Sequence, residues 1–190
     1  FTRGSGHNKF GAYTEMPDDY QEVLDRLARK HKAAAKFVPA PVIQRAEGRR
    51  QKAVDSDNGA SLPTAYRPGR MQPSHYVGTH PTPTRLGVIT LGGCDPAVCE
   101  ALEILARRGI DADYMRVRGF PFDESVEAFL DQHELCFVVE QNRDAQLRSL
   151  LILETSVPKE KLRSVLVYGG FPLSAQHVVD GIINEVMSGE

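Results

Sequence analysis

The chain has 190 residues, 41% of them hydrophobic, and a formal net charge of −2. This length suits one ordinary domain with an appendage or two small units, and the apolar fraction is sufficient for a buried core. The near-neutral charge disfavours a nucleic-acid partner, which usually requires a basic face. No apolar run approaches the roughly 20 residues that a membrane-spanning helix needs, so no membrane partner is expected.

The cysteine pattern disfavours both disulfides and metal centres. Cys94, Cys99 and Cys136 are odd in number and form no CxxC pair. This disfavours a disulfide framework and a zinc or iron–sulfur site made by this chain alone. No secretory signal is visible, and a cytoplasmic protein with reduced thiols is the expectation.

Residues 1–38 are predicted to be the tail of a preceding domain followed by a helix. Residues 1–16 are polar and irregular, and the helix is expected over 17–36, with Pro17 in its first turn. Acidic residues precede basic ones along it, as the helix dipole favours. Helical spacing places five side chains on one face: Tyr20, Val23, Leu24, Leu27 and His31.

Residues 39–85 change in character. Seven of the 12 prolines of the chain lie between residues 39 and 84, and apolar periodicity is absent there. This composition predicts a proline-rich extended connector, or an arm that lies over another surface.

Residues 86–190 alternate between strands and helices. Strands are expected at 86–91, 114–117, 135–139 and 164–167, and helices at 95–108, after Asp123, at 143–154 and after Ser174. Such alternation predicts an α/β domain of three layers around a mainly parallel sheet with right-handed crossovers.

Polar side chains gather where two of these strands end, which in open α/β sheets is where ligands and partners bind. Gln141, Asn142, Arg143 and Gln146 follow the third strand, within the run 138–148. They are interpreted as an interdomain or intersubunit network, with direct ligand contact as the alternative. Arg116 and Arg118 end the second strand. They could hold a carboxylate or phosphate, pair with Asp123 or Glu140, or reach another subunit.

The loop after the first strand allows two chemical hypotheses, and neither is preferred. Gly92 and Gly93 match no phosphate-loop spacing, so a tight turn with Asp95 capping the next helix is expected instead. Cys94 could be a nucleophile near a helix N-terminus, with His133 or His177 as base, but the neighbouring Asp95 opposes thiolate formation.

Several segments together resemble a known family. These segments are 2–8, 11–15, 20–23, 38–42, 113–118 with 120–122, 138–151 and 168–173. In this order and spacing they resemble the carboxyl-terminal part of the alpha subunit of two-subunit 2-oxoacid:ferredoxin oxidoreductases of the 2-oxoglutarate type. Two features depart from the family: the loop 91–95 replaces a small glycine–serine turn, and the connector at 45–84 is longer.

The resemblance implies a transketolase carboxyl-terminal-like fold for residues 86–190. It implies a parent enzyme that oxidatively decarboxylates a 2-oxoacid on thiamine diphosphate and Mg²⁺. Electrons would pass through an iron–sulfur cluster to ferredoxin, and the acyl group to coenzyme A. Thiamine diphosphate and the cluster would be held mainly by a beta subunit and an upstream alpha domain. This chain would then bind no cofactor or metal, contain no catalytic residue, and pack against its upstream domains and the beta subunit.

The sequence therefore leaves three functions open. The preferred one is a structural and interface domain of such an oxidoreductase, inactive alone. The second is a free-standing α/β module that binds coenzyme A or a nucleotide. The third is a self-contained enzyme that uses Cys94 as nucleophile.

Overall fold

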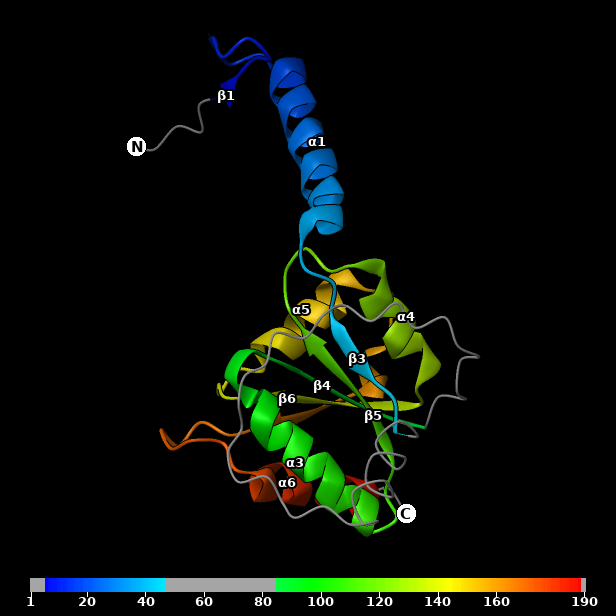
Figure 1. Ribbon diagram of the computed structural model, residues 1–190. Helices are drawn as coiled ribbons and strands as arrows, with labels where there is room; N and C mark the ends of the chain where they lie inside the picture. The colour runs from blue at the N-terminus through cyan, green and yellow to red at the C-terminus, as the bar shows by residue number, and fades with distance from the viewer. Residues whose placement is uncertain (1–5, 47–84, 189–190) are drawn as a thin grey trace.

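A computed structural model of the chain describes residues 6–46 and 85–188. Most of these residues form a sheet covered by helices, and one long helix, α1, projects away from this body (Figure 1). Within the described ranges, no helix combines the length and the apolar character that crossing a membrane requires.

The body is built on a five-stranded sheet with the order β3-β5-β4-β6-β7. All neighbouring strands pair in parallel except β3, which runs antiparallel along the edge of β5. The strands are β3 (Val42–Gln44), β4 (Leu86–Leu91), β5 (Ala112–Val117), β6 (Leu135–Glu140) and β7 (Leu162–Leu166). The mainly parallel sheet predicted from the sequence is confirmed.

Two pairs of helices cover the two faces of this sheet. Helices α3 and α6 pack on one face, and α4 and α5 pack on the other (Figure 1). Their bounds are α3 (Asp95–Arg107), α4 (Glu124–Gln132), α5 (Gln146–Glu154) and α6 (Ala175–Ser188). The three-layer α/β architecture expected from the alternation of strands and helices is therefore confirmed.

Alternation of side chains along each strand builds the two cores. Val88 and Phe137 face the α3/α6 side, whereas their neighbours Ile89 and Val138 face the α4/α5 side. All four are fully buried. Because both faces are covered, β6 is a continuous apolar run from Leu135 to Val139, as is typical of parallel sheets.

Several elements differ from the sequence-based expectation. β3 lies inside the range 39–85 assigned to the proline-rich connector, of which residues 47–84 lie outside the described residues. β5 begins at Ala112 rather than at 114, and the hairpin of residues 6–14 lies in a stretch expected to be irregular. α5 begins at Gln146 rather than at 143, because a side-chain-stabilised turn precedes it. β7 begins at Leu162 rather than at 164, because Leu162 pairs with Cys136 of β6.

Residues 6–37 form a separate structure, here called the arm. A short hairpin of β1 (Gly6–His7) and β2 (Tyr13–Thr14) precedes α1 (Pro17–Ala34), and a 3₁₀ turn, Ala35–Phe37, ends it. The ring of Tyr20 lies so close to Gly6 that a Cβ added there would be 2.6 Å from it. The hairpin and the helix are thus packed together, and a larger side chain at position 6 would displace the Tyr20 ring.

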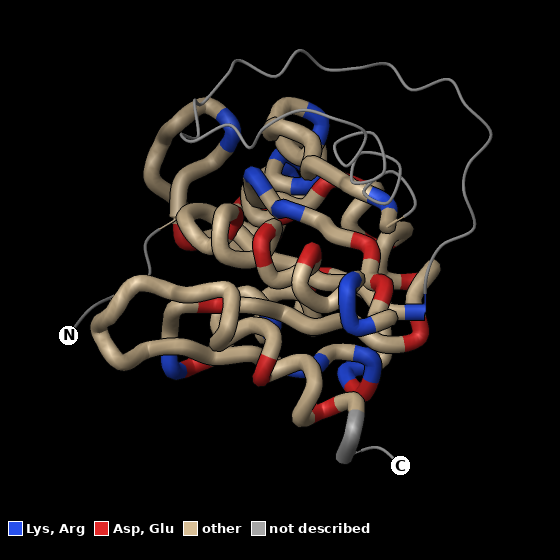
Figure 2. The backbone as a smooth tube through the Cα atoms, turned by 60° about the horizontal axis from the view of Figure 1, so that its bottom comes forward, with Lys and Arg blue, Asp and Glu red and all other residues tan. Residues whose placement is uncertain are grey.

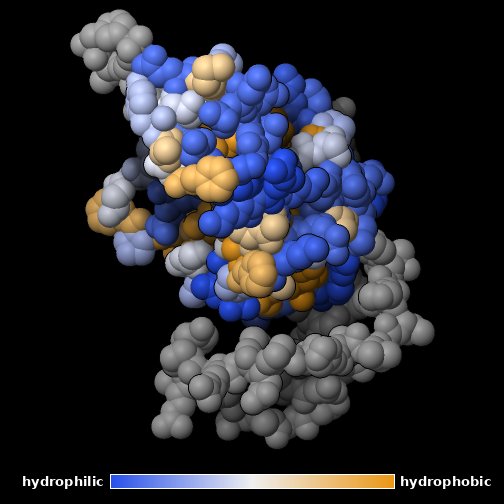
Figure 3. All heavy atoms as spheres, turned by 90° about the horizontal axis from the view of Figure 1, so that it is seen from above, coloured by the Kyte–Doolittle hydropathy of each residue, from blue (hydrophilic) through white to orange (hydrophobic). Residues whose placement is uncertain are grey.

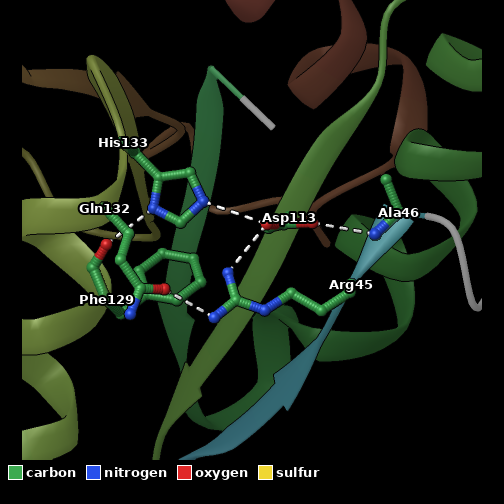
Figure 4. A network of polar contacts seen from close by, with 6 residues as sticks. All are labelled: Arg45, Ala46, Asp113, Phe129, Gln132 and His133. Carbon is green, nitrogen blue, oxygen red and sulfur yellow. Dashed lines mark hydrogen bonds and ion pairs between the residues drawn. The ribbon is translucent and has the colours of Figure 1, made fainter. Parts of the chain in front are cut away.

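A buried polar network fixes β3 to the sheet (Figure 4). Asp113 of β5 accepts hydrogen bonds from Nη1 of Arg45 at 2.8 Å and from the backbone N–H of Ala46 at 2.8 Å. Nε2 of His133, which follows α4, is 3.1 Å from the same carboxylate, and its Nδ1 is 2.6 Å from the carbonyl oxygen of Phe129. Three elements, β3, β5 and α4, therefore meet at one carboxylate.

The hydrogen bonds decide the charge of this carboxylate. Burial alone would raise the pKa of Asp113, whose side chain is only 1% exposed. Hydrogen bonds from His133, Arg45 and Ala46 outweigh that effect and lower the pKa to about 2. Asp113 is consequently ionised at neutral pH, and its contacts are charge-assisted.

Replacing Asp113 by Asn should destabilise the fold. The substitution keeps the shape but leaves Arg45 and His133 without their buried anion, which typically costs about 3 kcal/mol. Urea unfolding at pH 7 should show this loss in the free energy of unfolding. Glu134→Gln, which removes an exposed ion pair with Arg85, is the control and should cost much less.

The same pair of proteins gives a pH test. The pKa of Asp113 is lower in the folded than in the unfolded chain, so its contribution is fully present above about pH 4 and is lost as the pH falls toward 2. The stability difference between the wild type and Asp113→Asn should shrink over that interval. A difference that stays constant from pH 5 to the acid limit would contradict an ionised Asp113.

Candidate functional site

The carboxyl edge of the parallel strands is where such a fold normally binds a ligand. The chain leaves β4 toward one face of the sheet and leaves the adjacent β6 toward the other. The crevice expected at this change of direction lies between the loop after β4 and the loop after β6. The first loop is the 3₁₀ turn Gly92–Cys94, and the second is the run from Gln141 to Ala145.

Direct contacts between protein groups close this crevice. The hydroxyl of Thr90 donates to the carbonyl oxygen of Val139 at 2.8 Å, just below the edge. The thiol of Cys94 donates to Oε1 of Gln141 at 3.8 Å, directly across it. One side-chain contact within the chain therefore spans the crevice between the loops after β4 and β6.

The loop after β6 is an internally satisfied turn. The buried carboxylate of Glu140 accepts hydrogen bonds from the backbone N–H groups of Leu147 at 2.7 Å and Arg148 at 3.0 Å, and from Nδ2 of Asn142 at 2.7 Å. Oδ1 of Asn142 accepts in turn from the N–H groups of Asp144 and Gln146. These bonds satisfy the free N–H groups at the start of α5 that an anion would otherwise use.

The loop after β4 is held by a second polar cluster. Asp95 accepts a hydrogen bond from the hydroxyl of Tyr114 at 2.6 Å and pairs with Nη1 of Arg116 at 3.3 Å. Nη2 of Arg116 also donates to the carbonyl oxygen of Gly92 at 3.1 Å. Burial, followed by the hydrogen bond to Asp95, raises the pKa of Tyr114 above its usual value.

This cluster corrects two sequence-based expectations. Asp95 was expected to cap α3, but no side chain caps that helix, and the Asp95 carboxylate turns toward β5 instead. For Arg116 the sequence left three alternatives, an external carboxylate or phosphate, pairing with Asp123 or Glu140, and another subunit; in the structure its acidic partner is Asp95. Asp123 does cap α4, accepting from the N–H of Ser125 at 2.9 Å, as predicted.

The other candidate residues are divided between internal contacts and solvent. Asn142 belongs to the turn, and Gln141 contacts Cys94. Arg143 is exposed and pairs with the adjacent Asp144 at 2.7 Å. The side chains of Arg118 and Gln146 are exposed on the same edge. The structure thus brings the candidates to one edge without gathering them around a cavity.

Cys94 has no histidine base within its own loop. His133 lies before β6, at the opposite edge of the sheet, and is occupied by Asp113 and Phe129. His177 contacts Ser174 at the start of α6, where the Ser174 hydroxyl and the His177 Nδ1 are 2.9 Å apart. The Cys94 side chain itself is buried. The geometry gives no support to a nucleophilic Cys94.

The carboxyl edge also exposes apolar side chains that the sequence reasoning missed. They are Leu91, the last residue of β4, Phe120 in the loop after β5, and Tyr168 and Phe171 in the loop after β7. Tyr168 is 61% exposed and Phe171 is 80% exposed. The exposure of the aromatic residues could have been predicted from the sequence, because they lie in Gly- and Pro-containing loops without the spacing of core positions. Apolar side chains are visible among polar ones in the view from above (Figure 3).

Basic and acidic positions both occur on all sides of the described chain. They are not separated onto opposite sides of the molecule (Figure 2). In the ranges that the structure describes, no three His, Cys, Asp or Glu side chains are arranged to hold a metal ion. The edge is therefore a mixed apolar and polar surface, which is typical of a protein–protein contact.

Comparison with solved structures finds the same fold in a larger enzyme. A 2-oxoglutarate:ferredoxin oxidoreductase from Magnetococcus marinus, with 2-oxoglutarate, coenzyme A and succinyl-CoA bound, matches 98% of this chain with a TM-score of 0.67 and 19% identity. The match covers 26% of that chain, so the present chain spans about a quarter of its length. The mainly parallel three-layer fold is shared with that enzyme.

Two transketolases match less closely. A split-gene transketolase, described as an inactive beta4 tetramer, has a TM-score of 0.44 and 18% identity over 67% of this chain and 47% of its own. Transketolase from Campylobacter jejuni subsp. jejuni has a TM-score of 0.35 and 12% identity over 58% and 18%. No protein-family model and no curated protein sequence matches the chain.

The turn after β6 can be tested with Glu140→Gln. The amide keeps the size of the carboxylate but points an N–H group at the N–H groups of α5, so about 1–2 kcal/mol of stability should be lost. Hydrogen exchange should show faster opening at Leu147 and Arg148. Glu154→Gln, an exposed change at the other end of α5, is the matched control. Equal exchange in both variants would show that Glu140 does not hold the turn.

The state of Cys94 can be tested by alkylation. Iodoacetamide should label Cys99, which is partly exposed, before the buried Cys94 and Cys136. Burial also raises the pKa of Cys136 to about 12, which makes it an internal reference for an unreactive thiol. Peptide mass spectrometry gives the labelling rate at each position. Labelling of Cys94 as fast as free glutathione would revive the nucleophile hypothesis.

Proposed function

We propose that this chain is a structural and interface domain of a thiamine diphosphate-dependent 2-oxoacid:ferredoxin oxidoreductase, and that it corresponds to the carboxyl-terminal part of the alpha subunit. The observation that carries the proposal is the match of 98% of the chain to about a quarter of an enzyme of that activity. The resemblance of the motifs along the sequence supports the same assignment independently.

The carboxyl edge supports an architectural rather than a chemical role. Its polar groups are used within the chain: Glu140 and Asn142 form the turn before α5, and Arg116 is paired with Asp95. Its exposed groups include the aromatic side chains of Tyr168 and Phe171 and the polar side chains of Arg118 and Gln146. Such a surface suits contact with another domain better than binding of a small substrate.

In the proposed enzyme, the cofactors belong to other parts of the assembly. Thiamine diphosphate with Mg²⁺ and the iron–sulfur cluster would be bound by an upstream domain and a beta subunit. The oxidised substrate would be a 2-oxoacid, with 2-oxoglutarate as the first to examine, coenzyme A as acyl acceptor and ferredoxin as electron acceptor. Residues 86–188 would pack against these parts through the carboxyl edge.

The proposal is tested by assaying the chain alone and within its native assembly. The isolated chain should neither bind thiamine diphosphate or coenzyme A in calorimetry nor reduce methyl viologen with any 2-oxoacid. Material purified from the native cells through a tag on this chain should reduce methyl viologen when supplied with a 2-oxoacid and coenzyme A. A tagged assembly without this activity would overturn the assignment.

Calorimetry also separates the alternative function. Micromolar binding of coenzyme A or a nucleotide to the isolated chain, weakened by Arg143→Ala, would identify a free-standing binding module. Asp144→Ala, which removes the partner of Arg143 and leaves the guanidinium in place, is the control.

A further inference from the structure

The ring of His133 has an acceptor oxygen against each of its two nitrogens (Figure 4). Nδ1 lies 2.6 Å from the carbonyl oxygen of Phe129, and Nε2 lies 3.1 Å from Oδ2 of Asp113. A ring C–H group normally keeps its carbon about 3.3 Å or more from an oxygen, so the shorter contact fixes the orientation of the ring. The His133 side chain is 0% exposed, so bulk solvent reaches neither nitrogen.

Neither of these oxygens has a proton to give to the ring. The carbonyl oxygen of Phe129 only accepts. Despite burial, hydrogen bonds hold the pKa of Asp113 at about 2, so this carboxylate also only accepts at neutral pH. A neutral imidazole has one N–H group and one lone pair, and in either tautomer the lone pair would face an oxygen. An imidazolium donates to both oxygens and leaves no such conflict.

The end of α4 favours a positive charge at the same place. The last carbonyl groups of a helix have no N–H partner within the helix, and the negative end of the helix dipole lies there. Nδ1 of His133 serves the carbonyl of Phe129, and Nζ of Lys161 serves those of Leu130 at 2.9 Å and Asp131 at 3.3 Å. A second proton on His133 is therefore stabilised by the helix as well as by Asp113.

The aromatic ring of Phe129 lies beside both basic groups of this network. Its centroid is 4.3 Å from that of the His133 ring and 5.8 Å from Cζ of Arg45. The face of such a ring attracts cations. Burial and the charge of Arg45 act against a second cation, and the carboxylate of Asp113, which bonds to both basic groups, offsets them.

The ionisable groups around the ring come from several elements. They are Arg45 of β3, Asp113 of β5, Cys136 of β6, Lys161 before β7 and the exposed pair of Arg85 and Glu134. A Cβ added at Gly87 of β4 would lie 2.9 Å from Sγ of Cys136 and 3.2 Å from the His133 ring, so the thiol faces the imidazole. Burial raises the pKa of this thiol to about 12. Among the described residues, His133 is therefore the group of this network whose charge can change between about pH 5 and pH 9.

We infer that His133 carries a proton on both ring nitrogens at neutral pH, and that this proton locks α4, β5 and β3 together at Asp113. The lock is sensitive to pH, because loss of the proton at alkaline pH sets a lone pair against one of the two oxygens and loosens the junction. Since β3 connects the arm to the sheet, the arm is held most firmly when His133 is charged. The inference goes beyond the proposed function and does not depend on it, because every group involved belongs to this chain.

Nitrogen NMR of the full chain with isotope-labelled histidine tests the proton directly. At pH 7 both ring nitrogens of His133 should give the signals of protonated nitrogens, and their protons should exchange slowly with water because the ring is buried. The exposed His177 in the same sample is the internal reference, and its ring protons should exchange rapidly. The His133 signals are assigned through the backbone, so no variant is needed. One protonated and one unprotonated nitrogen at His133 would overturn the inference.

Urea unfolding between about pH 6.5 and 8.5 tests the lock. An imidazole in an unfolded chain releases its proton around pH 6.5, whereas the folded chain retains it, so the stability that His133 adds should fall as the pH rises. Relative to His133→Gln, the folding equilibrium constant of the wild type should decrease by up to about tenfold per pH unit. Asp113 is ionised throughout this interval and does not contribute to the change. A relative stability that stays constant or rises would mean that the folded protein contains a neutral His133.

His177→Gln is the matched control for both measurements. It removes an exposed histidine, and glutamine at this position can still close a capping box with Ser174. This variant should not reproduce the fall in stability. The backbone N–H of Ala46, which donates to Asp113 at 2.8 Å, should exchange faster in His133→Gln than in His177→Gln. Equal exchange at Ala46 in the two variants would show that the proton does not hold β3.

Discussion

The buried carboxylate of Asp113 is the contact on which the arrangement of the two parts of the molecule depends. It is the point where the edge strand β3, the inner strand β5 and the end of α4 are joined by charge-assisted hydrogen bonds. β3 is also the segment through which the chain passes from the arm into the sheet. These bonds to Asp113, here called the clamp, add to the three residue pairings between β3 and β5 and to the packing of His31 on Phe120. The clamp therefore converts a short strand into a rigid attachment, and the packing of His31 on Phe120 sets the direction in which the arm leaves.

At the opposite edge of the sheet, the chain uses its own side chains where parallel α/β domains often bind a ligand. Parallel strands deliver loops to their carboxyl edge, and helix N-termini there normally offer free N–H groups to anions. In this chain the carboxylate of Glu140 takes that place at α5, and Asp95 turns its charge inward toward Tyr114 and Arg116. The N–H groups of α5 and the guanidinium of Arg116, which could attract a phosphate, are bonded to carboxylates of the chain itself. Aromatic side chains are exposed at the same edge. Such an edge stabilises its own loops and is available for contact with another surface.

The sequence predicted the layers well because they follow from local patterns. The run at 86–91 coincides with β4, and the two-sided burial of Leu135 to Val139 appears in the sequence as an unbroken apolar stretch. β3 escaped prediction because it has three residues and two nearby prolines, so its existence depends on pairing with β5, far along the chain. The contacts of the candidate site were also hard to predict, because they join residues that are distant in the sequence. The location of the candidates at the carboxyl edge followed from topology, but the partner of Arg116 is an aspartate 21 residues away, which no local pattern reveals.

β3 has one more consequence, for the solubility of the protein. It lies along the outer edge of β5 and pairs with Tyr114, Met115 and Arg116, so that part of this edge has no free backbone groups with which a foreign strand could pair. An unprotected edge of this kind invites sheet-to-sheet association. Detachment of β3 would leave the backbone N–H and C=O groups of β5 along residues 114–116 unpaired at this edge. The ion pair that joins β3 to the sheet is in this sense a safeguard against aggregation.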